Sequence, residues 1–149
     1  MALTGFERSV LIAAVAQPTT GKKLAEVIDN ASDGVSTVEF SVAAEDTNAI
    51  AVTCTAKTLL GKALDNKVTF DMMIVSNTST LAYNSSDYTI AATTGTVLEL
   101  VADKLIRVTT NASGVAVVTL TITGAATSYL VPVLKNGELG TASGAITHA

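Results

Sequence analysis

The chain has very few of the side chains with which most enzymes work. Its 149 residues include one cysteine, one histidine and no tryptophan, and aromatic residues make up 4%. A zinc site needs several Cys or His ligands, and a catalytic triad needs a base oriented by a third group. Cys54 lies in phase with Ile50 and Val52, which predicts a core residue, and His148 is expected in a loose tail. We therefore expect no enzyme, no catalytic residues, no metal and no cofactor.

Charge is also sparse. Charged residues make up 15% of the chain and the formal net charge is −4. A nucleic-acid-binding domain would carry a basic stripe, and the compact basic cluster here is only Lys22-Lys23. We expect no nucleic-acid partner. A surface of Thr, Ala and Ser with few charges is typical of a protein packed against copies of itself or against partners.

Long apolar runs are missing as well. The longest run, Val10 to Ala16, is too short to cross a bilayer. It follows Arg8 and faintly imitates a signal peptide, but the apolar region is too short and would have to contain the cleavage site. We expect no membrane partner and no cleaved export signal, with synthesis in the cytoplasm.

What the chain does contain is alternation with a period of two residues. The turn signal Asn111–Gly114 runs into Val115–Thr123, in which Ala116, Val118 and Leu120 share one face. Similar segments are found at 38–42, 50–56, 68–74, 88–90, 97–101, 105–109 and 129–134. Frequent turns between short strands predict an all-β fold, an antiparallel β-sandwich of about seven strands over residues 36–149, with a short C-terminal tail. Pro132 predicts a sheet edge or a bulge.

Residues 1–35 form a different region, which we interpret as an N-terminal docking arm. Thr4 and Glu7 have capping-box spacing, which favours a short helix from residue 6 to about residue 16; an extended apolar segment is the alternative. The arm contacts either its own sandwich or another chain. The candidate assembly contacts are its apolar side chains, Phe6, Val10, Leu11, Ile12 and Val15.

Two clusters of oxygen-bearing side chains resemble calcium ligands only superficially. One contains Asp29, Asn30 and Asp33, and the other spans residues 84–87. Both lie between predicted elements, where Asn and Asp commonly hydrogen-bond to the nearby backbone. We interpret both as turns.

Two motifs resemble those of bacterial Ig-like domains of the invasin/intimin type. In Leu60–Phe70, a Gly turn precedes a strand of the form Val-x-Phe, and Thr109–Leu120 fits the later pattern Thr-x-x-x-Gly-x-Ala-x-Val-x-Leu. The resemblance covers roughly residues 36–137 and implies an Ig-like sandwich. The stretch from Leu81 to Leu105 fits loosely, which leaves the strand order there open. The family has no catalytic residues to carry over.

Members of that family serve as stalks, adhesin modules and decorations of cell surfaces and bacteriophage particles. A surface-type module without an export signal suggests a structural virion protein of a tailed bacteriophage, assembled in the host cytoplasm. The expected function is capsid decoration, with the major capsid protein, other virion subunits and copies of itself as partners. The alternatives are a tail-tube, collar or fibre subunit, or a bacterial adhesin or carbohydrate-binding module.

Overall fold

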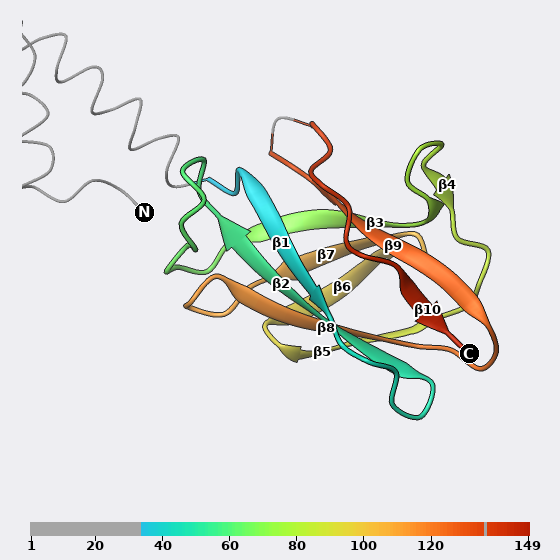
Figure 1. The fold of residues 1–149 in the computed structure, drawn as a ribbon. Helices are drawn as coiled ribbons and strands as arrows, with labels where there is room; N and C mark the ends of the chain where they lie inside the picture. The colour runs from blue at the N-terminus through green and yellow to red at the C-terminus, as the bar shows by residue number, and fades with distance from the viewer. Residues whose placement is uncertain (1–33, 136) are drawn as a thin grey trace, which may run out of the picture.

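The computed structural model describes residues 34–135 and 137–149, which contain ten β-strands and no helix (Figure 1). The strands are β1 (Thr37–Val42), β2 (Ala49–Lys57), β3 (Thr69–Asn77), β4 (Ala82–Tyr83), β5 (Thr89–Thr94), β6 (Thr96–Val101), β7 (Leu105–Thr109), β8 (Val115–Thr121), β9 (Ala126–Val133) and β10 (Ile146–His148). The predicted all-β class is confirmed for these residues. The predicted N-terminal arm lies outside the described residues, apart from its last two positions.

The strands form two antiparallel sheets. One has the order β1-β2-β8-β5, and the other has the order β10-β9-β3-β7-β6, with β4 added to β3. Seven of these strands follow the immunoglobulin constant-domain arrangement, with β1, β2, β8 and β5 in one sheet and β3, β9 and β10 in the other. The hairpin of β6 and β7 extends the second sheet beyond β3.

The core lies between the sheets and follows the alternation in the sequence. In β2 every second residue is buried, from Ile50 to Ala56, and in β8 the same holds from Ala116 to Leu120. β-Branched and small apolar residues fit this pleated surface because their side chains stand perpendicular to the sheet and pack across it. The predicted inward face of these two strands is confirmed.

The chain passes from one sheet to the other at a single glycine. Only Gly95 separates β5, an edge strand of the first sheet, from β6, an edge strand of the second. Gly95 has a φ of +75°, and a Cβ atom there would lie 2.3 Å from the carbonyl oxygen of Thr109. The corner therefore requires glycine both for its backbone conformation and for the close approach of Thr109.

The last residues are part of the sheet, so the prediction of a loose tail around His148 is wrong. Ile146–His148 form β10, which pairs with the start of β9 (Figure 1). Ile146 and His148 are fully buried, and the exposed Thr147 lies between them. Three residues are too few to display a clear period, which is why the alternation of this strand does not stand out in the sequence.

At Pro132, one side of β9 is not paired with a continuous strand. Its carbonyl accepts a hydrogen bond from the N–H of Gly140, at 2.8 Å. In a strand, the nitrogen and the carbonyl of one residue point to the same side, so the missing N–H also faces Gly140. The pairing of Pro132 with Met72 on β3 therefore loses no hydrogen bond, although β9 is an inner strand, between β10 and β3, and not the predicted sheet edge.

Candidate interaction surface

The outer faces of the two sheets differ in chemistry. On the four-stranded sheet, the outward positions are mostly small or polar residues, together with two valines and the ion pair Lys57–Glu39. These positions are Thr37, Glu39, Ser41, Ala49, Ala51, Thr53, Thr55, Lys57, Thr89, Ala91, Val115, Val117, Thr119 and Thr121. This face matches the expected Thr/Ala/Ser surface.

The six-stranded sheet carries larger apolar side chains on its outer face. Met73 lies opposite Leu105 on β7 and Val131 on β9, and Leu105 in turn lies opposite Val101 on β6. These four residues form one row across four strands. With Leu98 and Val133 from the adjacent row, they make up the surface that we call the apolar outer face. Val131 is buried yet stands outside the core cluster.

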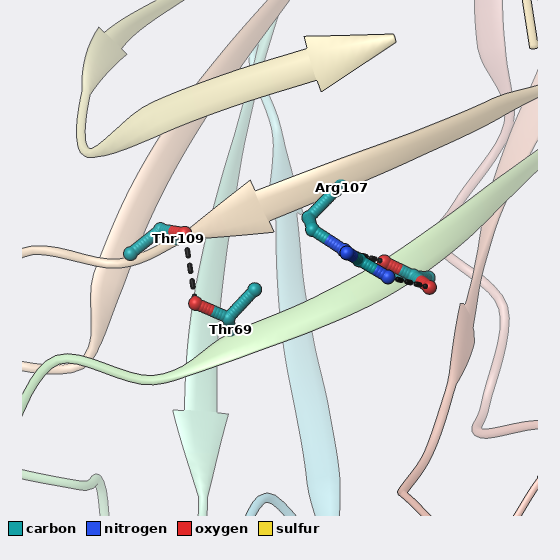
Figure 2. Close-up of polar contacts among 4 residues, drawn as sticks. Thr69, Arg107 and Thr109 are labelled. Carbon is teal, nitrogen blue, oxygen red and sulfur yellow. Dashed lines mark hydrogen bonds and ion pairs between the residues drawn. The ribbon is translucent and has the colours of Figure 1, made fainter. Parts of the chain in front are cut away.

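A charged pair lies within this surface. Asp71 on β3 and Arg107 on β7 are cross-strand neighbours, between Val133 and Leu98 in the same row. The guanidinium donates from Nε to Oδ1 at 2.8 Å and from Nη2 to Oδ2 at 3.0 Å (Figure 2). These hydrogen bonds, together with the positive charge, lower the pKa of Asp71 below its ordinary value.

A hollow lies at the end of the same face. Thr69 and Thr109 share a hydrogen bond of 2.8 Å there (Figure 2). The hollow has a volume of about 530 Å³ and is lined by Val68–Asp71, Arg107 and Val133–Lys135, together with Gly34 and Val35. Gly34, the first described residue, therefore lies beside the apolar outer face.

The sequence-predicted contacts lie elsewhere in the chain. Phe6, Val10, Leu11, Ile12 and Val15 are outside the described residues, as are Asp29, Asn30 and Asp33. Their role as assembly contacts stays a prediction.

The apolar outer face was missed because we interpreted β3 as strictly alternating. The available signal was its uninterrupted apolar run, Met72–Val75, which is matched by Tyr129–Val133 on the neighbouring strand. Continuous apolar runs are typical of strands with both faces covered. A strictly alternating strand buries only one of its faces. Such a strand would carry polar residues at the positions where this chain has Met73, Val75 and Val131.

Cys54 is a core residue, as predicted. Its side chain is fully buried in the core cluster, and the thiol lies 3.8 Å from the carbonyl oxygen of Val52. Burial raises the pKa of Cys54 to about 12. A nucleophilic cysteine needs a depressed pKa and access to solvent, and Cys54 has neither.

His148 links three elements at the opposite end of the domain. Its Nε2 lies 3.1 Å from the carbonyl oxygen of Leu120 on β8, and its ring lies 5.8 Å from the ring of Tyr88. Asn84 donates to the Tyr88 hydroxyl and to the carbonyl of Thr127. His148 Nδ1 and the buried hydroxyl of Ser128 each lack a protein hydrogen-bond partner, so no Ser–His hydrogen bond forms here. The geometry is that of a structural contact.

The second oxygen cluster forms the turn that we predicted. The side-chain oxygen of Asn84 accepts a hydrogen bond from the N–H of Ser86, at 2.8 Å, which is an Asx turn. Within residues 34–135 and 137–149, no three His, Cys, Asp or Glu side chains converge as metal ligands would. No helix long and apolar enough to span a membrane occurs in the same ranges.

The fold and the surface together define an antiparallel β-sandwich with one small-residue outer face and one apolar outer face. No family model matches the chain, and no curated protein matches it either.

Proposed function

We propose that this chain is a structural virion protein of a tailed bacteriophage, a capsid decoration protein that binds the outside of the head. The observation that carries the proposal is the apolar outer face, where Leu98 and Val101 are exposed and Met73, Leu105 and Val133 are partly exposed. The exposed face of an antiparallel sheet is usually polar, and a contiguous apolar patch usually marks an interface. The immunoglobulin-like strand order and the family resemblance support the same assignment.

The asymmetry of the sandwich favours one-sided docking. Large apolar residues gather on one sheet, and the opposite sheet presents small side chains of the Thr and Ala type. A subunit of a ring or tube uses two different surfaces to contact its two neighbours. A decoration protein instead turns one surface to the shell and the other to solvent, which suits the present distribution better.

The proposed mechanism is linkage by many weak contacts. Each copy lies across a joint between capsid subunits and buries its apolar outer face there. The Asp71–Arg107 pair gives the contact polar specificity, because a wrong partner would leave those charges unmatched. Many such copies resist the outward pressure on the shell through multivalency, although each contact alone is weak.

The test is binding to heads that lack the protein. Purified chain is mixed with such heads, the heads are pelleted, and bound copies are counted. Leu98→Asp introduces a charge on the apolar outer face, so binding should fall at least tenfold. Leu60→Asp is the matched control, because Leu60 is 87% exposed in the turn after β2 and lies outside that face. Absence of binding by the unaltered chain, or equal loss in both variants, would overturn the proposal.

A further inference from the structure

β6 is an edge strand with one open side. It pairs with β7 on one side, and no strand among the described residues pairs with its other side. Its six residues, Thr96–Val101, contain a single charge, at Glu99, and no proline. Natural edge strands are normally blunted by lysine, proline, a bulge or a cover because their free N–H and C=O groups recruit other strands, and β6 has a bulge between Glu99 and Val101 but neither lysine nor proline.

Its side chains are also unusually apolar for an edge. Leu98 is 60% exposed and Val101 is 49% exposed, and both belong to the apolar outer face. A bulge between Glu99 and Val101 inserts Leu100, which is exposed as well. A strand added along β6 would therefore extend the apolar row and cover leucine and valine surface in addition to satisfying backbone groups.

The other edges offer less to a partner. β1 is flanked by the ion pair between Glu39 and Lys57, and β10 has only three residues. β5 presents Thr and Ala, and its small side chains would bury little apolar area. Among the described strands, β6 therefore gains most from being paired.

We propose that the segment Val10–Val15 of one copy of this chain adds as a strand along β6 of a second copy. This segment is apolar, uncharged and rich in β-branched residues, which suits strand addition. The inference goes beyond the proposed virion function because it requires only two copies of this chain.

The length and the starting point of the arm support exchange between copies. The arm leaves the domain at Gly34, beside Asp71 and Arg107 on the same sheet. A fully extended chain of 18 residues, the number between Val15 and Gly34, reaches up to roughly 60 Å at about 3.3 Å per residue, which is enough to reach a neighbouring copy.

Thiol cross-linking of the full chain tests the pairing. Native Cys54 is buried, so introduced cysteines react selectively. A size-tagged chain carrying Ile12→Cys is mixed with a chain carrying Leu98→Cys. A short bifunctional maleimide is then added, because its length accommodates a shift of one or two residues in the register of the paired strands. The linked heterodimer should form at least ten times faster than with Leu60→Cys, a control at another exposed leucine. Equal rates for the two mixtures would overturn the inference.

A double variant separates exchange from folding back. Ile12→Cys/Leu98→Cys at low micromolar concentration should give linked dimers and larger species. A linked monomer would place the arm on its own β6 and would overturn the inference. Hydrogen exchange provides a check without substitutions, since the amides of residues 96–101 should lose protection on dilution. Head binding does not enter either measurement, so failure of the virion proposal remains distinguishable.

Discussion

Asp71 and Arg107 are 36 residues apart in the chain and directly opposite each other on β3 and β7, joined by two parallel hydrogen bonds. A one-residue slip between these strands would send Arg107 to the core side and break both bonds. In a sheet whose outer and inner faces are both apolar, hydrophobic pattern alone specifies register weakly. The charged pair supplies the missing specificity.

Asp71→Asn should lower stability by a small amount that depends on pH. The folded pKa of Asp71 lies below its ordinary value of 3.8, so the carboxylate stabilises the native state above that pH. This contribution disappears as the pH falls through the lower, folded pKa. Urea midpoints of the variant and the unaltered chain should therefore differ at pH 7 and draw together as the pH falls below 3.8. A gap that is constant from pH 7 to pH 3 would contradict this account. The gap is small because the pair is partly exposed.

Gly95→Ala should be strongly destabilising. The new Cβ would lie 2.3 Å from the backbone oxygen of Thr109, at the corner where the chain changes sheets. Gly61→Ala is the control, since Gly61 has nearly the same φ, +77°, and open space around it. The control should cost about 1 kcal/mol for the left-handed conformation alone. In chemical denaturation, Gly95→Ala should lower the free energy of unfolding by at least about 1 kcal/mol more than Gly61→Ala does, as expected of overpacking. Equal losses in the two variants would mean that the corner relaxes freely.

His148→Ala should destabilise the domain by roughly 2 kcal/mol or more, although the residue is second to last. It removes a fully buried ring and leaves the carbonyl of Leu120 without its side-chain partner. Thr147→Ala, on the exposed side of the same strand, should change the free energy of unfolding by less than about 0.5 kcal/mol. Thermal and urea unfolding check both variants. Equal, negligible effects would show that β10 contributes little.

Cys54 should be inert in the native protein. With its pKa raised to about 12, hardly any thiolate exists at pH 8, and the side chain is inaccessible. A chromogenic thiol reagent should react only after denaturant is added, and the native rate should match that of global opening. Rapid stoichiometric labelling at pH 8 would contradict the buried position.

Alternation in the sequence is enough to predict β2 and β8, because each buries one face and the inward residues recur with period two. It fails for β10, where three residues give no period, and at Gly95, where a backbone contact with Thr109 decides the sheet change. Such a contact joins distant residues and leaves no local signal except the glycine itself.

The candidate surface was harder to predict for a related reason. An apolar residue at an outward position of β3, such as Met73, is indistinguishable from a core residue until the pairing with Leu105 and Val131 is known. The sequence does not show which residues of neighbouring strands lie opposite each other. That pairing brings apolar residues from distant parts of the chain together into one surface.

Cryo-electron microscopy of heads bearing this protein tests the central claim most directly. The account predicts density for the sandwich on the outer surface of the head, with Met73, Leu98 and Leu105 turned toward the capsid shell and the Thr/Ala face of β2 and β8 toward solvent. Heads without such density, or copies that meet the shell through the four-stranded sheet, would contradict it.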